Sequence, residues 1–259
     1  GDESLVIISE TSCSERARAM SQEVRNVVIL TGAGVSTDSG VPDFRGPQGV
    51  WTKNPLAEKM SDIRFYMSDP EVRRLAWQSR LKHPALTAAP NSAHDAIASF
   101  EQTGKLTSLV TQNIDGLHQA AGNTPSKVIE IHGTIHRVMC MSCQKKTRMK
   151  DELTRVSGGN LDPSCLDCNG ILKSDTISFG QPLDETKIAM AFDYVKNSDL
   201  LLCIGTTLQV FPIAGAVDVA KAAGAKLIIV NNQATQYDDV ADGVLRDSIN
   251  EVIPLILGV

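Results

Sequence analysis

Four short runs of mostly apolar, largely β-branched residues alternate with helix-like segments along this chain. Runs of this kind are typical of strands in a parallel sheet that helices cover on both faces. A weaker run spans residues 128–131. The alternation of strands and helices predicts an α/β fold with a doubly wound parallel sheet. The four stronger runs span residues 27–31, 106–111, 200–204 and 226–230.

Helix start signals lie between these runs. Asn91 and Asp184 are good N-caps, because their side chains can accept hydrogen bonds from the first free backbone N–H groups. Ser12 with Glu15 forms a possible capping box for an N-terminal helix that ends near Val24.

The composition narrows the class of protein. A chain of 259 residues with 42% hydrophobic residues can bury its own core, which excludes intrinsic disorder. No apolar run reaches the ~18–20 residues that a membrane-spanning helix needs. The net charge of −5 argues against nucleic acid as the main partner, and a local basic cluster at 145–150 is interpreted as a solvated face.

The six cysteines include two close pairs, Cys140-x-x-Cys143 and Cys165-x-x-Cys168. No signal-peptide pattern is visible, so we expect a reducing compartment such as the cytoplasm, with the nucleus or an organelle left open. Two disulfides or four buried thiols are the alternatives, but the spacing favours one tetrahedral zinc ion. Four thiolates leave no open coordination position, so the zinc would be structural.

Two stretches interrupt the alternation of strands and helices. Residues 51–90 are polar and predict a helical module, and residues 136–180 hold both cysteine pairs and predict a zinc-binding module. We interpret both as insertions that form a smaller lobe. The remaining segments, 1–50, 91–135 and 181–259, are assigned to the large lobe that contains the sheet.

Small and polar residues follow four predicted strands. Because ligands bind at the carboxyl ends of strands in doubly wound sheets, these residues are expected to line one crevice. A Gly-x-Gly turn suits a diphosphate, but the next glycine is Gly40, so the spacing departs from that of ordinary dehydrogenases. A plain strand-to-helix turn is the alternative. The four groups are 32–36, 112–115, 205–207 and 231–233.

His132 ends the weaker run and precedes Gly133. This position predicts an imidazole at the same crevice, where it could take a proton from a hydroxyl group. The alternative is a histidine that only makes a hydrogen bond within the fold.

Taken in order, these motifs resemble those of the sirtuins, a family of NAD-dependent protein deacylases. The resemblance runs from about Asn26 to Leu255, nearly the whole chain. Besides the two cysteine pairs, the motifs are 32–36 (Gly-Ala-Gly-Val-Ser), 40–51 (Gly-Val-Pro-Asp-Phe-Arg-Gly-Pro-Gln-Gly-Val-Trp), 111–118 (Thr-Gln-Asn-Ile-Asp-Gly-Leu-His), His132-Gly133 and 205–212 (Gly-Thr-Thr-Leu-Gln-Val-Phe-Pro).

The resemblance implies a Rossmann-like lobe, a smaller lobe with a zinc-ribbon module and a helical module, and a cleft that takes NAD and an acylated-lysine peptide. It implies His132 as general base and Asn113 as a second catalytic residue. The implied NAD contacts are Gly32, Ala33, Gly34, Thr37, Asp43, Phe44, Arg45, Trp51, Gln112, Asn113, Asp115, His132, Gly205, Thr206, Thr207, Asn231, Asn232, Gln233 and Ile249.

The implied chemistry begins when the acyl oxygen of the modified lysine attacks the nicotinamide ribose and nicotinamide leaves. His132 then activates a ribose hydroxyl, and the products are free lysine, nicotinamide and O-acyl-ADP-ribose. Protein mono-ADP-ribosylation is the alternative outcome for the same pocket. A non-enzymatic zinc-ribbon adaptor is disfavoured by the presence of Asn113, Asp115 and His132 together.

Substrate preference is the open point of the resemblance. Ile177, Phe179 and Gly180 lie in the segment that would pair with the peptide, but Gln181 stands where the family usually has Glu. Trp77 and Arg80 align with a Tyr and an Arg of desuccinylating members. A core Trp and a surface Arg explain these two residues equally well, so acetyl or longer apolar acyl groups are favoured over succinyl.

Overall fold

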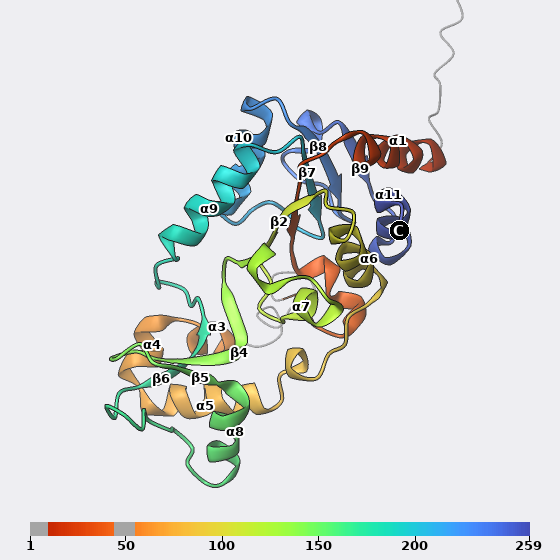
Figure 1. Ribbon diagram of the computed structural model, residues 1–259. Coiled ribbons are helices and arrows are strands. Elements are labelled where there is room, and N and C mark those ends of the chain that lie inside the picture. The colour runs from red at the N-terminus through yellow and green to blue at the C-terminus, as the bar shows by residue number, and fades with distance from the viewer. Residues whose placement is uncertain (1–9, 44–54) are drawn as a thin grey trace, which may run out of the picture.

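The computed structural model describes residues 10–43 and 55–259. Its larger lobe is built on a parallel sheet of six strands in the order β3-β2-β1-β7-β8-β9 (Figure 1). This is the strand order of a Rossmann-type sheet, so the predicted fold class is confirmed. The strands are β1 (Val27–Thr31), β2 (Leu106–Thr111), β3 (Val128–Glu130), β7 (Leu200–Ile204), β8 (Lys226–Val230) and β9 (Gly243–Leu245).

Both faces of this sheet are buried, as the apolar runs predict. Along β1, Val27 and Ile29 face one apolar core, whereas Val28 and Leu30 face the other. Figure 1 shows α1, α6 and α11 on one side of the sheet and α9 and α10 on the other. These helices are α1 (Glu10–Glu23), α6 (Ser92–Glu101), α9 (Glu185–Lys196), α10 (Ala216–Ala222) and α11 (Ile249–Leu257).

Two of the predicted helix starts are confirmed, and one is wrong. The Asn91 side chain accepts from the backbone N–H groups of Ala93 and His94, and Asp184 caps α9 in the same way. The described part of α1 begins at Glu10, so Ser12 lies inside the helix and is not its N-cap. Short helical pieces are η1 (Ala33–Val35), η2 (Thr37–Ser39), α7 (Leu117–Ala121), η4 (Pro125–Lys127), η5 (Ile213–Gly215) and η6 (Asp238–Val240).

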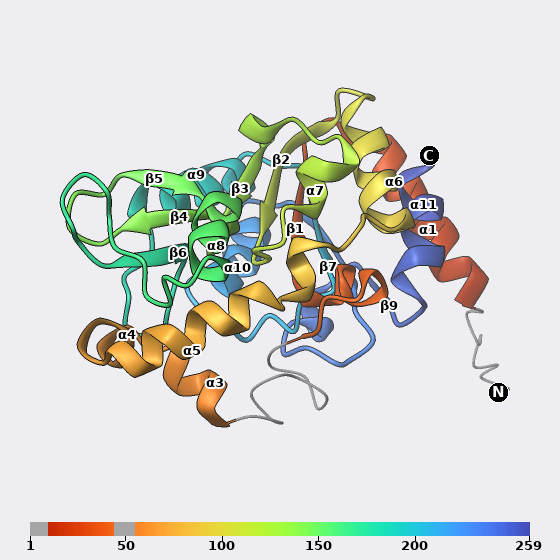
Figure 2. The ribbon, with the colours of Figure 1, turned by 90° about the horizontal axis from the view of Figure 1, so that it is seen from below.

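The smaller lobe combines helices and a second sheet (Figure 2). Its sheet is antiparallel, with the strand order β5-β4-β6. Described residues 55–90 form three α-helices and one 3-10 helix, in agreement with the predicted helical character, but Asp62 makes an isolated β-bridge to Phe179 that was not predicted. The elements are α3 (Pro55–Met60), α4 (Ile63–Ser68), α5 (Pro70–Leu81), η3 (Pro84–Leu86), β4 (Gly133–Cys140), β5 (Lys146–Arg148), α8 (Met149–Ser157) and β6 (Leu172–Thr176).

One apolar core joins the helical and cysteine-bearing parts of this lobe. Trp77 from α5 packs in the same cluster as Ile135, Met149 and Leu172. Leu117, which follows β2 of the large sheet, belongs to this cluster too. The loop after β2 is therefore anchored to the smaller lobe by apolar burial.

The basic cluster of the smaller lobe is largely neutralised. Lys145 forms an ion pair with Asp167 at 2.9 Å, and Lys146 forms one with Asp175 at 3.3 Å. Arg148 pairs with Asp151 of α8 at 3.0 Å. These ion pairs fit the interpretation of a solvated face. No helix among the described residues has the length and apolar character that a bilayer crossing requires.

Candidate active site and metal centre

The loops after β1 and β7 lie side by side where the strand order of the large sheet reverses. Ligands of doubly wound sheets bind outside the carboxyl ends of the strands at such a point. The Gly32 N–H donates to the Ile204 carbonyl at 3.0 Å, and the Gly34 N–H donates to the Gly205 carbonyl at 2.9 Å. The two loops therefore meet backbone to backbone.

This contact explains the glycines of the Gly-x-Gly turn. A Cβ atom at Gly34 would lie 2.7 Å from the Cα of Gly205, and one at Gly32 would lie 2.7 Å from the Gly205 carbonyl oxygen. Gly205 itself has a φ of 65°, which favours glycine. These glycines are thus required by the packing of the loops on each other, a reason that the diphosphate interpretation of the sequence did not include.

Asn113 is oriented by the loop that follows β1. Its Nδ2 donates to the Gly32 carbonyl at 3.0 Å and reaches the Ser36 hydroxyl at 3.5 Å. The other side-chain atom, Oδ1, can only accept a hydrogen bond. The network thus assigns the amide orientation, with both donor hydrogens directed at the β1 loop.

A buried histidine supports the backbone of Asn113. The Asn113 N–H donates to the Thr111 hydroxyl oxygen at 3.1 Å, and the Thr31 hydroxyl donates to the same oxygen at 2.8 Å. His118 Nε2 lies 2.8 Å from the Thr31 oxygen, so this nitrogen carries the proton and donates. Burial, followed by the nearby His94, lowers the pKa of His118 to about 3.

Ser36 and His94 support the side chain of Asn113. The Asn91 N–H donates to Nδ1 of His94, so Nε2 carries the proton and donates to the Ser36 hydroxyl at 3.2 Å. Sequence reasoning placed Ser36 in the group after the first strand but gave no role to His94 or His118. The signal for His94 was its position three residues after Asn91, where it completes a capping box.

His132 lies between β3 and β4 and contacts the loop after β2. Its Nδ1 lies 3.0 Å from the Gln112 carbonyl, which only accepts, so Nδ1 carries the proton and the basic lone pair of the neutral ring is on Nε2. Gly133 follows with a φ of 81°, and a Cβ there would lie 2.0 Å from the Asp175 carbonyl oxygen.

Gln112 connects three of the predicted strand ends. Its carbonyl accepts from His132, and its side-chain oxygen accepts from the Thr206 hydroxyl at 2.7 Å. The Gln112 N–H donates to the Thr31 carbonyl at 2.9 Å. The structure therefore brings Gln112, Thr206 and His132 together, as the strand-end pattern predicts.

The remaining predicted cofactor residues differ in burial, and some of them lie outside the described part of the chain. The Thr37 hydroxyl donates to the Gly34 carbonyl, and the buried Asn231 side chain donates to the Gln233 carbonyl. Ile249 is the first residue of α11 and is half-buried. Ala33, Asp43 and Thr207 are half-buried, and Asn232 is exposed. Phe44, Arg45 and Trp51 lie outside the described residues.

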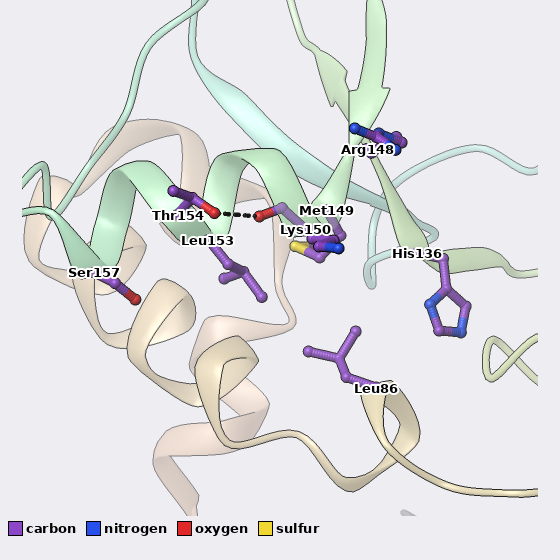
Figure 3. A pocket seen from close by; sticks show the side chains of 8 residues that line it. All are labelled: Leu86, His136, Arg148, Met149, Lys150, Leu153, Thr154 and Ser157. Atoms are coloured by element: carbon purple, nitrogen blue, oxygen red, sulfur yellow. Dashed lines mark hydrogen bonds between the residues drawn. The ribbon is translucent and has the colours of Figure 1, made fainter.

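Asp115 is buried in the loop after β2 and contacts a residue that borders a cavity in the smaller lobe. Its carboxylate accepts from the Leu117 N–H at 3.0 Å, and its carbonyl accepts from His136 Nε2 at 2.8 Å. His136 borders a cavity of about 550 Å³ between α8, η3 and β4 (Figure 3). None of the residues that line this cavity belongs to the four strand-end groups. It is lined by Leu86, His136, Arg148, Met149, Lys150, Leu153, Thr154 and Ser157.

The predicted peptide-binding segment adjoins His132. The Ile177 N–H donates to the His132 carbonyl at 2.9 Å. Phe179 pairs with the helical part, because its N–H donates to the Ser61 carbonyl and its carbonyl accepts from the Ile63 N–H. Gly180 follows with a φ of 79°.

Trp77 and Arg80 both make their contacts within the smaller lobe. Trp77 is fully buried in its core, with a relative exposure of 1%. Arg80 Nη2 donates to the Ser174 hydroxyl at 3.0 Å and lies 3.4 Å from the Thr176 hydroxyl. Arg80 is therefore engaged with β6, not exposed on the surface.

The four paired cysteines converge at the end of β4. Their Sγ atoms all lie within 4.8 Å of one another, and the Cys140–Cys168 and Cys143–Cys165 distances are 3.4 and 3.7 Å. Four thiolates at ~2.3 Å from a tetrahedral zinc would stand about 3.8 Å apart, so this set fits the ion. The Sγ of Cys140 also accepts from the backbone N–H groups of Ser142 and Cys143, each at 3.4 Å, as a thiolate ligand would.

A doubly wound sheet with hydrogen-bonding residues gathered at its switch point, together with a separate four-cysteine centre, defines a nucleotide-binding α/β protein with a structural metal module. The chain belongs to the Sir2 family, because the model described as "Sir2 family" matches residues 32–212. The resemblance stated from the sequence is thereby confirmed.

Curated relatives and solved structures agree with this assignment. The chain is 46% identical over 231 residues to NAD-dependent protein deacetylase 2 of Streptomyces coelicolor, covering 89% of this chain and 96% of that protein. It is 41% identical to NAD-dependent protein deacetylase 1 of Pyrobaculum aerophilum, covering 99% and 93%. A structure described as Sir2 bound to acetylated peptide matches with a TM-score of 0.82 and 32% identity, covering 94% of this chain and 97% of that one.

Removing the metal is expected to disrupt the smaller lobe and leave the large sheet folded, because the thiolates join both ends of the cysteine-bearing part. The chain has two tryptophans, so a Trp51→Phe background leaves Trp77 as the only reporter of the lobe's core. Cys140→Ser or a chelator should abolish zinc binding, measured by elemental analysis, and shift the Trp77 emission to the red. Cys13→Ser is the matched control and should change neither. Unchanged emission after complete zinc loss would contradict this prediction.

His118 predicts an acid-dependent loss of stability. The unfolded chain takes up a proton at this residue below pH ~6.5, but the folded chain does not until about pH 3. Stability is therefore lost as the pH falls below ~6.5, by at most about 1.4 kcal/mol per pH unit. His118→Gln, whose amide can still donate to Thr31, should reduce the stability difference between pH 7 and pH 5, measured by urea unfolding. Equal differences in the variant and the wild type would rule this out.

Proposed function

We propose that this chain is an NAD-dependent protein-lysine deacylase that acts on acetyl or other apolar acyl groups. The acyl group is transferred to ADP-ribose and nicotinamide is released. The observation that carries the proposal is the His132 ring, whose Nδ1–H bond to Gln112 leaves the basic lone pair on Nε2 beside the polar crevice. The names of the curated relatives and the acetylated peptide in a similar Sir2 structure support the same activity.

The donor set of the crevice fits NAD. Neutral amides and hydroxyls, such as those of Gln112, Thr206 and Asn231, suit ribose hydroxyls, and the glycine backbone of the β1 loop suits a diphosphate. When bound, NAD supplies the ADP-ribose acceptor and nicotinamide as the leaving group. We assign Phe44, Arg45 and Trp51 to the same cofactor, on the motif alone.

Three residues divide the proposed catalytic work. His132 accepts a proton from a ribose hydroxyl at Nε2, while its bond to Gln112 maintains the tautomer. Asn113 and Asp115 hold the nicotinamide end. The two threonines and His118 beneath Asn113 restrict its backbone, which keeps the amide in one orientation.

The surroundings of Arg80 support the preference for apolar acyl groups. Its guanidinium donates to hydroxyls of β6, and a buried tryptophan without a phenol hydroxyl stands where desuccinylating members have tyrosine. A succinyl carboxylate would have to compete with the β6 hydroxyls for Arg80.

We also propose the division into a lobe with the parallel sheet (1–50, 91–135 and 181–259), a helical module (51–90) and a zinc module (136–180), with β4 crossing the boundary between the first and the last. The four-cysteine centre favours a reducing compartment, and we propose the cytoplasm.

Activity is tested by incubating the protein with NAD and matched peptides that carry acetyl-, decanoyl- or succinyl-lysine. We expect nicotinamide and O-acyl-ADP-ribose by mass spectrometry, with acetyl or decanoyl turned over faster than succinyl. No product with any peptide would refute the proposed function. Label from NAD that stays on protein would instead point to ADP-ribosyl transfer.

The role of His132 is tested by His132→Ala. Loss of a general base is expected to reduce product formation by about 10²–10⁴-fold. Zinc content and the urea midpoint should stay at wild-type values. The reason is that the ring and its hydrogen-bond partner, Gln112, are both only half-buried. Product formation near the wild-type rate would exclude His132 as the base.

A further inference from the structure

Lys173 is a buried lysine that the proposed mechanism does not use. It lies on β6, which ends the strand order β5-β4-β6 and therefore has one edge without a strand neighbour in this sheet. Its relative exposure is 3%. Lysine is rarely buried to this extent without a specific partner, so its surroundings require an explanation.

The backbone N–H and C=O groups of β6 point alternately toward β4 and toward the outer edge of the sheet. Ile171 accepts from Met141, and Ile177 donates to the His132 carbonyl, so the odd-numbered residues face β4 and its extension. Because successive residues of a strand point their backbone groups to opposite sides, the even-numbered carbonyls face outward. Carbonyls buried at that edge need donors from elsewhere.

Side chains supply those donors. The Tyr66 hydroxyl from α4 donates to the Leu172 carbonyl at 2.5 Å. Lys173 Nζ donates to the Ser174 carbonyl at 3.1 Å and also to the Thr176 carbonyl. One ammonium thus binds two successive outward carbonyls, as donors of a neighbouring strand would.

The charge at this position is costly to bury. Arg80 lies beside it and donates to the Ser174 hydroxyl at 3.0 Å. Burial, followed by the positive charge of Arg80, lowers the pKa of Lys173 to about 7, while Asp175 opposes this shift. An apolar side chain would fill the space without this cost, but it would donate nothing to the two carbonyls.

The second of these carbonyls lies immediately before the proposed peptide-binding segment. Ile177 follows Thr176 and donates to the His132 carbonyl at 2.9 Å. Two residues later, Phe179 pairs with Ser61 and Ile63. The position of the Thr176 carbonyl therefore determines where the segment begins, next to the residue proposed as the base.

We propose that Lys173 is a positioning residue for the acyl-lysine peptide, because its ammonium holds the end of β6 and thereby sets the peptide-binding segment 177–180. This inference rests on the proposed function. Lys173 acts through the backbone of Thr176 and does not contact the reacting atoms.

The test is Lys173→Met, which keeps the length of the side chain and removes the donors. Steady-state kinetics with an acetyl-lysine peptide and NAD should show the peptide KM raised about 10- to 100-fold, as expected for lost hydrogen bonds from a charged group. The KM for NAD should stay within about twofold, because the strand ends of the large sheet are untouched. Lys150→Met, an exposed lysine on α8, is the matched control and should match the wild type.

A second variant covers the case in which Lys173→Met fails to fold, judged by zinc content and urea unfolding. Lys173→Gln retains an amide donor, and we expect a smaller rise in the peptide KM with the NAD KM unchanged. Faster amide hydrogen exchange at Ile177 should accompany either rise. A peptide KM at the wild-type value, or equal changes in both KM values, in a folded variant would overturn the inference. Lack of product from the wild type would instead mean that the proposed function fails.

Discussion

The close backbone contact between the loops after β1 and β7 is the constraint on which the rest of the site depends. It brings the carboxyl ends of two adjacent parallel strands so near each other that glycine is required at Gly32, Gly34 and Gly205. The Gly32 carbonyl then accepts from Asn113, and Thr206 donates to Gln112. Residues far apart in the chain are therefore oriented by one contact at the switch point of the sheet.

His132 stands where the two lobes meet. On one side, its ring donates to the Gln112 carbonyl after β2, and on the other its carbonyl accepts from Ile177 after β6. The strand that begins one residue later, β4, ends at Cys140 of the four-cysteine cluster. A metal with no open coordination position would thus support the proposed activity by holding the sheet that adjoins His132, the proposed base.

Sequence patterns predicted the strands that are buried on both faces of the large sheet. The apolar runs became β1, β2, β3, β7 and β8, because strands buried on both faces must be apolar throughout. The strands β6 and β9 and the helix α8 were not predicted. β6 reads Leu-Lys-Ser-Asp-Thr, a polar run that carries no apolar strand signal, although its residues are mostly buried and its outer carbonyls accept from Tyr66 and Lys173. The N-terminus of α1 was placed wrongly, since a capping-box pattern also occurs inside helices.

The sequence by itself determined the α/β class and the grouping of the four cysteines, and it singled out His132 as the proposed base, because each depends on residue type, spacing or position after a strand. Only the tertiary structure decided which ring nitrogen of His132 carries the proton, how the Asn113 amide is turned, and that Arg80 is engaged with β6. These properties depend on hydrogen-bond partners from distant segments. Local sequence patterns carry no information about such partners until the strands are placed side by side.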